Sequence, residues 1–237
     1  MKSIKFIVVF LTLGVFANFQ VKAQITGQGS SVTEKIDLPV ITSIGLGIAA
    51  DVYLTQGSKQ EITIKAQKNI IENIKKEVKN GSWNIEFDKK VTDHNDIKIY
   101  ITLATIKDLS VGGSGSIVSE SKFTNLGDLN LSIGGSGDIK LHADARDISC
   151  SIGGSGEIEL QGTGDELSVS IGGSGDVDAF DLPVKKCSVS ASGSGDINVN
   201  VSNELSVSLV GSGDVNYKGN PKVSSSIIGS GDVEKVN

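Results

Sequence analysis

Acidic residues recur at one position of a short repeat, directly after the sequence Gly-Ser-Gly. If the repeats stack, neighbouring carboxylates lie one coil apart. Together with backbone carbonyls they could bind a divalent cation, in the spirit of calcium-binding Gly-Gly-x-Gly-x-Asp repeats. Alternatively, each carboxylate accepts hydrogen bonds from backbone N–H groups of its own corner, as short polar side chains do in turns. The calcium candidates are Asp138, Glu157, Asp176, Asp196, Asp214 and Asp232, with Asp51 as an outlier.

The same acids offer one route to catalysis, because carboxylate pairs on adjacent coils could act on a glycosidic bond. They recur evenly, however, and no aromatic platform accompanies them, whereas an active site normally interrupts a repeat. The serines belong to the repeat, and a nucleophile needs a neighbouring base. His94 and His142 have no Cys or His at metal-ligand spacing and are interpreted as surface residues. We therefore expect no catalytic residues and no cofactor other than calcium.

The repeat that carries these acids determines the fold prediction. The motif is Gly-Ser-Gly, usually followed by an acid and then Ile or Val, and successive copies are 22, 19, 19, 20, 18 and 18 residues apart. Near-constant spacing of this kind is typical of a solenoid that tolerates small insertions at its corners. The seven copies begin at Gly113, Gly135, Gly154, Gly173, Gly193, Gly211 and Gly229.

Within each copy, apolar residues alternate with polar ones, and this period of two predicts strands. Both glycines of each Gly-Ser-Gly share the inward parity, where a side chain would collide with the neighbouring wall, so they mark a tight corner between two strands. Stacking about 4.8 Å apart would pair each strand with its copies and create one apolar column. The predicted fold is an all-β parallel β-solenoid, right-handed by default, of about seven to eight coils of 18–22 residues.

Cys150 and Cys187 share the inward parity of the repeat but fall in coils two apart. On the same stacking estimate their backbones would lie about 9.6 Å apart, beyond the roughly 7 Å limit for a disulfide. The sequence therefore predicts two buried thiols without a bridge.

Residues 24–107 are less regular than the repeats. Ala50-Asp51-Val52 stands where Gly-Asp-Val stands later, so the solenoid begins with a degenerate copy at 48–54. Asn80-Gly81 predicts a two-residue hairpin turn, and residues 69–76 predict a short helix with three isoleucines on one face. This region is expected to cover the end of the stack. Further strands are predicted at 61–66, 82–87 and 97–103.

The N-terminus reads as an export signal. Lys2 and Lys5 precede an apolar run over 6–19, and Val21-Lys22-Ala23 predicts cleavage after Ala23. No Cys adjoins this site to receive a lipid, and the mature chain contains no apolar stretch long enough to span a membrane. We expect a signal peptide over 1–23, a lead-in over 24–39 and one domain over 40–237. Export would place it in the periplasm, on the outer-membrane surface or outside the cell.

Charge narrows the range of partners. The formal net charge is −6, and Arg146 is the only arginine, so nucleic acid is excluded as a partner. Residues 24–107 hold 11 Lys against 10 acids, whereas 108–237 hold 8 basic and 18 acidic residues. The acidic half either maintains solubility or forms a surface for a cation or a basic partner.

The order of these features resembles the head GIN domain of putative auto-transporter adhesins, a family common in Bacteroidetes. The resemblance covers residues 40–217, and the repeats at 133–139, 152–158 and 171–177 match it most closely. It implies a β-helical exported protein with an adhesin-like role, and it supplies no catalytic residues.

Three functional hypotheses follow. The first is a non-catalytic adhesin-like binding or surface-structural module of the envelope, with a glycan or protein ligand. The second is a carbohydrate-acting β-helix enzyme, and the third is a protein-interaction module inside the envelope. In each case the last coil, near Val233, lacks a cover, which makes end-to-end self-association credible.

Overall fold

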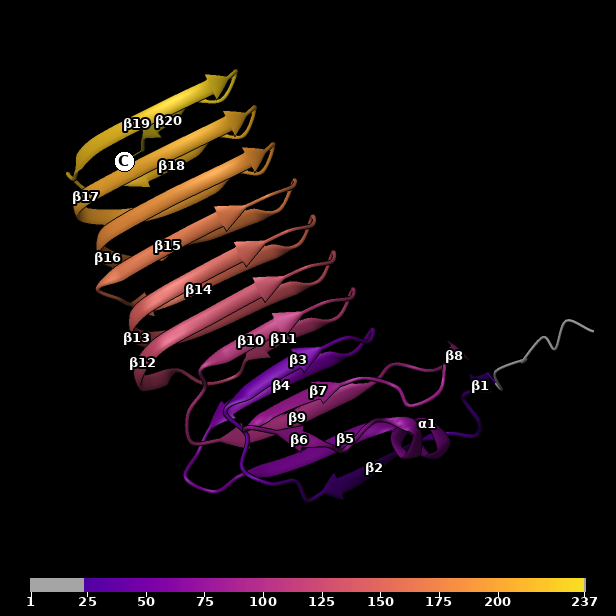
Figure 1. Cartoon of the computed structure of the whole chain (residues 1–237). Coiled ribbons are helices and arrows are strands. Elements are labelled where there is room, and N and C mark those ends of the chain that lie inside the picture. The colour runs from indigo at the N-terminus through magenta and orange to yellow at the C-terminus, as the bar shows by residue number, and fades with distance from the viewer. Residues whose placement is uncertain (1–23, 237) are drawn as a thin grey trace, which may run out of the picture.

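Each repeat contains two runs of alternating apolar residues, and these form two strands that meet at the Gly-Ser-Gly corner. In the computed structural model, which describes residues 24–236, the repeats stack so that each strand pairs in parallel with its copies. The expected parallel β-solenoid is confirmed, with about seven turns, 64% strand and 3% helix. Figure 1 shows the stack as a ladder of near-parallel arrows.

Three long strands bend at the far side of the coil, so that each supplies the second strand of one coil and the first strand of the next. They are β13 (Asp138–Ile152), β16 (Asp176–Gly193) and β17 (Ile197–Gly211). The other strands of the repeat half are β10 (Asp108–Val111), β11 (Ser116–Ser119), β12 (Phe123–Ile133), β14 (Glu157–Thr163), β15 (Glu166–Ile171), β18 (Val215–Lys218), β19 (Lys222–Gly229) and β20 (Val233–Lys235).

The core is a set of apolar columns that run along the stack. Small branched side chains repeat at each inward position because the space between the two walls is narrow, and almost all of them are fully buried. One column contains Ile139, Ile158, Val177, Ile197 and Val215. Burial of each such side chain contributes about 1.5–3 kcal/mol to folding.

The corner glycines are required by close approach of backbone to backbone. A Cβ built on Gly135 would overlap the carbonyl oxygen of Gly113 one coil below, and one on Gly154 would overlap that of Gly135. The neighbouring Gly134 has no atom within 4 Å of such a Cβ. The expected collision is therefore confirmed, but it occurs with the coil below and not with the opposite wall.

The lower end of the stack does not follow chain order. Strands β3 (Ser43–Leu46) and β4 (Asp51–Gln56) form the degenerate coil, and its Asp51 lies in register with Ser116 of the first repeat. Strands β7 (Ser82–Ile85) and β9 (Lys98–Leu103) come later in the chain but lie below that coil. The chain then returns past β3 to form β10 on its other side.

An antiparallel cap covers this lower end. Strand β5 (Glu61–Gln67) pairs antiparallel with β9, and β2 (Ser31–Ile36) pairs antiparallel with β5. Helix α1 (Lys68–Asn73) follows β5, and Figure 1 shows it beside these strands at the end of the stack. A separate two-stranded sheet joins β1 (Ile25–Thr26) to β8 (Val91–Asp93).

The predicted helix and hairpin are both present. The helix is shorter than the expected 69–76, because Ile74 takes an extended conformation (φ −76°, ψ 130°) and bridges to Phe87. Strand β6 (Val78–Lys79) pairs with β7 across a two-residue turn, with Asn80 and Gly81 at φ values of 52° and 77°. The positive φ angles at both positions are those of a type I′ turn.

The expected signal peptide, with its cleavage after Ala23, lies outside the described residues. Among the residues that are described, no helix is long and apolar enough to cross a membrane.

Candidate functional site

The predicted carboxylate ladder is present at the corners. Asp138, Glu157 and Asp176 occupy equivalent positions on successive coils. From Asp176 to Asp214, each carboxylate accepts a hydrogen bond from the backbone N–H of the acid one coil further on. Asp196 N donates to Asp176 Oδ1 at 2.8 Å, and Asp214 N donates to Asp196 Oδ1 at 3.1 Å. These carboxylates therefore bond the backbone of the next coil, and not the backbone of their own corner.

The ladder changes partners at Glu157. The N–H of Glu157 donates to Asp138 Oδ1 at 3.3 Å, but the N–H of Asp176 donates to the Gly156 carbonyl at 3.1 Å. At the lower end, Asp51 accepts a hydrogen bond from the hydroxyl of Ser116 at 2.9 Å.

Calcium binding at this ladder stays a prediction. Within residues 24–236, no three carboxylate, imidazole or thiol side chains lie close enough together to hold a metal ion. The six candidates form a line along the stack and do not converge on one point.

The histidines and cysteines contribute no reactive group at the ladder. His94 contacts the edge of Phe87, and the backbone N–H of His142 donates to Ser119 Oγ at 2.8 Å. Both imidazoles are half-buried. Cys150 and Cys187 are buried and unbridged, as predicted, and burial raises the pKa of both thiols to about 12. A thiol with such a pKa is neutral and inert at pH 7.

The strands that follow the corners form one of the two walls of the solenoid. The outer face of this wall carries an aromatic pair that the sequence analysis does not suggest. Tyr53 in β4 and Tyr100 in β9 stack with ring centroids 5.0 Å apart and an interplanar angle of 17°. Tyr100 is 39% exposed. Tyr53 lies two residues after the outlying acid Asp51 on the same face, so the aromatic pair accompanies the degenerate coil.

Polar side chains flank the two rings on the same strands. On one side of the rings Lys98 lies opposite Asp51 in the strand register, and on the other side Thr102 lies opposite Thr55. We call these six residues the tyrosine patch: Asp51, Tyr53, Thr55, Lys98, Tyr100 and Thr102. Because the strands that contribute them are far apart in sequence, only the interleaved order of the lower coils reveals the patch.

Charged side chains lie on this face on both sides of the tyrosine patch. Beyond the patch toward the cap lie Lys65 and Lys35. In the other direction the column of Tyr53 continues through Val118 to Lys140 and Glu159. The latter two form an ion pair at 2.7 Å, which raises the pKa of Lys140 and lowers that of Glu159. Glu61, opposite Thr102, pairs with Lys35 at 3.8 Å, so charged residues of both signs lie on each side of the tyrosine patch.

The other wall of the solenoid, formed by the strands that precede the corners, presents two columns of serine hydroxyls on its outer face. The sequence signals these columns by a Ser-x-Ser motif before the corners. Because inward and outward positions alternate along a strand, both serines of the motif lie on the outer face. Strand pairing aligns the serines in register from coil to coil. One column contains Ser110, Ser132, Ser151, Ser170, Ser190, Ser208 and Ser226, and the other contains Ser149, Ser168, Ser188, Ser206 and Ser224.

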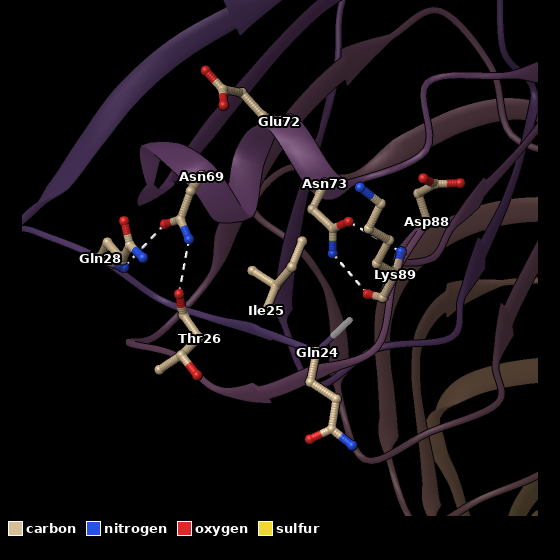
Figure 2. A pocket seen from close by; sticks show the side chains of 9 residues that line it. All are labelled: Gln24, Ile25, Thr26, Gln28, Asn69, Glu72, Asn73, Asp88 and Lys89. Atoms are coloured by element: carbon tan, nitrogen blue, oxygen red, sulfur yellow. Dashed lines mark hydrogen bonds between the residues drawn. The ribbon is translucent and has the colours of Figure 1, made fainter. Parts of the chain in front are cut away.

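A polar pocket of about 430 Å³ lies beside α1 at the cap (Figure 2). Two of its side chains hold the surrounding chain in place. Asn69 accepts from Gln28 N at 3.0 Å and donates to the Thr26 carbonyl at 2.8 Å. Asn73 makes the equivalent pair of bonds with the backbone of Lys89, at 3.0 and 2.8 Å. These amides are engaged in joining β1 and the segment before β8 to the helix.

Comparison with known proteins identifies related sequences and folds. The family model "putative auto-transporter adhesin, head GIN domain" matches residues 42–221. A putative adhesin from Bacteroides fragilis NCTC 9343 is similar at 26% identity and a TM-score of 0.82, covering 90% of this chain and 100% of that one. A putative lipid binding protein from Parabacteroides distasonis ATCC 8503 is similar at 28% identity and a TM-score of 0.75, covering 91% and 100%. No curated protein matches.

Proposed function

The chain belongs to the family of putative auto-transporter adhesin head GIN domains, and on this basis we propose that it is an exported, non-catalytic binding module of the bacterial envelope. The adhesin-like description of the family and of a structural neighbour supports this role. Export would use the signal segment expected over residues 1–23.

The ligand proposed for this module is a glycan, and the tyrosine patch is the observation that carries the proposal. Tyrosine presents a rigid apolar ring with a polar tip, which suits a surface that binds a partner carrying both CH groups and hydroxyls. Lys98 and Asp51 on one side of the rings, and two threonines on the other, supply donors and acceptors for sugar hydroxyls. The paired strands β4 and β9 hold these side chains in place, so binding does not require the backbone of the site to become ordered.

The hydrogen bonds that the corner carboxylates accept favour binding without turnover. A glycosidase needs one carboxyl group that carries a proton and another that attacks or activates water. Here the upper corner aspartates each accept a hydrogen bond from a backbone N–H group of the next coil. They are therefore better suited to holding adjacent coils together than to proton transfer.

The test is a glycan-array screen of residues 24–237, followed by affinity measurement on the best polysaccharide. Tyr53→Ala and Tyr100→Ala are each expected to weaken binding about tenfold. Phe180→Ala is the matched control, because this aromatic ring is covered by the Lys218 ammonium at 4.4 Å and offers no open platform.

Three results would overturn the proposal. Binding that survives both tyrosine substitutions would exclude the tyrosine patch as the site. Release of shorter saccharides, lost when Asp138, Glu157 and Asp176 are neutralised, would show a carbohydrate-acting enzyme instead. Absence of glycan binding together with co-purification of an envelope protein would favour a protein-interaction module.

A further inference from the structure

The two ends of the solenoid are built differently. At the lower end, β5 and β2 continue the sheet in antiparallel fashion beyond β9, and α1 lies beside them (Figure 1). At the upper end, β19 pairs only with β17, and β20 pairs only with β18. Among the described residues nothing pairs with the outer edges of these two strands, so the upper end is an open β-edge.

Apolar side chains are exposed at this open edge. Val223 and Ile227 continue two core columns but are 36% and 38% exposed. Their counterparts one coil below, Leu205 and Leu209, are 0% and 1% exposed. On the outer face Ile228 is 68% exposed, above Val210 at 46%. The core therefore ends without a cover. Pro221 directly precedes β19, but within β19 no proline, bulge or inward charge protects the edge.

In the corner of the last coil, the backbone N–H of Val233 already has a hydrogen-bond acceptor within the same corner. In the coils below, Val215 N donates to the carbonyl of Asp232, and Ile197 N donates to that of Asp214, each one coil further on. Val233 has no such carbonyl above it, and its N–H donates to the carboxylate of its own Asp232 at 2.7 Å. The N–H of Val233 is therefore already paired, and the edge that remains available to a partner is the straight strand β19.

We propose that a second copy of this chain binds at the open edge, with the two β19 strands paired antiparallel about a two-fold axis. The edge strand of the lower end, β2, also pairs on one side only, but it carries Glu34 opposite the buried Ile64, and an inward charge of this kind discourages edge pairing. The apolar edge of β19 therefore favours a contact that joins two upper ends. Residues 222–237 carry two lysines and two acids, so two such ends meet without net repulsion, unlike two acidic coils.

The side-chain pattern of β19 selects one register. In an antiparallel pair, directly opposite residues lie on the same face of the sheet. An axis through Ser225 places Val223 opposite Ile227 of the partner subunit and aligns both with the apolar interior. Shifting the axis to Ser226 would place Ser225 opposite Ile227 and lose the apolar match.

The first experiment measures the mass of residues 24–237 by light scattering and sedimentation across a range of concentrations. We expect a dimer, and we expect Ile227→Lys to convert it to a monomer by placing a charge inside the joint. Ser188→Lys, on an exposed serine in the middle of the stack, is the control that should leave the dimer intact. Circular dichroism of each variant verifies that the solenoid is folded.

The second experiment tests the register with an engineered thiol. Opposite residues in an antiparallel pair lie about 4.5–5.5 Å apart at Cα, which is within disulfide range. Ser225→Cys should form an intermolecular disulfide on mild oxidation, whereas Ser188→Cys should not, and the native thiols are buried.

Three outcomes would overturn the proposal. They are a monomer at every attainable concentration, a dimer that survives Ile227→Lys, and cross-linking at Ser188→Cys equal to that at Ser225→Cys. A monomer whose open edge instead captures a strand of another protein would belong to the first of these.

Discussion

At the scale of single residues, the molecule distinguishes neighbouring glycines that look alike in the sequence. Gly134 and Gly135 are adjacent in the same corner, but only Gly135 faces the backbone of the coil below. The same contrast separates Gly153 from Gly154. The second and third letters of Ile-Gly-Gly-Ser-Gly therefore have different physical roles. Of these two glycines, coil stacking requires only the third letter.

This contrast gives the first prediction. Gly135→Ala should destabilise the fold by about 3 kcal/mol or more, because the new methyl group would meet the Gly113 carbonyl, which cannot move without separating two coils. Gly134→Ala should change stability by less than about 0.5 kcal/mol. Urea unfolding followed by circular dichroism measures both, and equal effects would contradict the stacking account.

A second prediction concerns the carboxylate ladder. Asp196→Ala removes the acceptor for Asp214 N and should lower Tm by about 2–4 °C, whereas Asp196→Asn keeps an acceptor oxygen and should have little effect. Because the candidate carboxylates form a line and, within residues 24–236, do not converge in a group of three, we expect millimolar calcium to leave Tm unchanged relative to EDTA. A calcium-dependent rise that disappears when Asp176 and Asp196 are neutralised would instead establish the ladder as a metal site.

At the scale of elements, the sequence predicts those features that depend on local patterns. The seven repeats, the degenerate copy at Asp51 and the Asn80-Gly81 turn are all present, because period-two alternation and turn chemistry are local signals. The helix boundary was less accurate, because the bridge from Ile74 to Phe87 is a tertiary contact. The tyrosine patch was not predictable, since it depends on β9 lying below β4.

The hairpin between β6 and β7 permits a test at this scale. Gly81 has a φ of 77°, so Gly81→Val should strain the turn and cost about 1–3 kcal/mol. Asn80→Gly keeps a residue that accepts positive φ and should be tolerated. Trp83 is fully buried opposite Val78, so its fluorescence reports unfolding of this segment. An equal response to both substitutions would contradict the turn assignment.

At the scale of the whole molecule, the two ends of the solenoid differ in how they assemble. The strands of the lower end are interleaved, whereas the upper coils follow one another in chain order. The coil formed by β3 and β4 lies between strands that the chain makes later, so residues 43–119 must assemble together. The upper coils contact only their nearest neighbours, and their stability is a sum of such contacts. If two copies join at their open ends, each pair also presents two tyrosine patches, which would strengthen attachment to a repetitive glycan.

This asymmetry predicts a gradient of hydrogen exchange along the stack. In dilute monomer, amides of β19 and β20 should exchange fastest among the repeat strands, because each has a partner on one side only, and protection should rise through β17 to β15. The cap should prevent a matching gradient at β9. Raising the protein concentration should protect β19 selectively if copies pair there, and Ile227→Lys should abolish that protection. Uniform protection from β10 to β19 in the monomer would show that the stack opens as one cooperative unit, in contradiction to a nearest-neighbour solenoid.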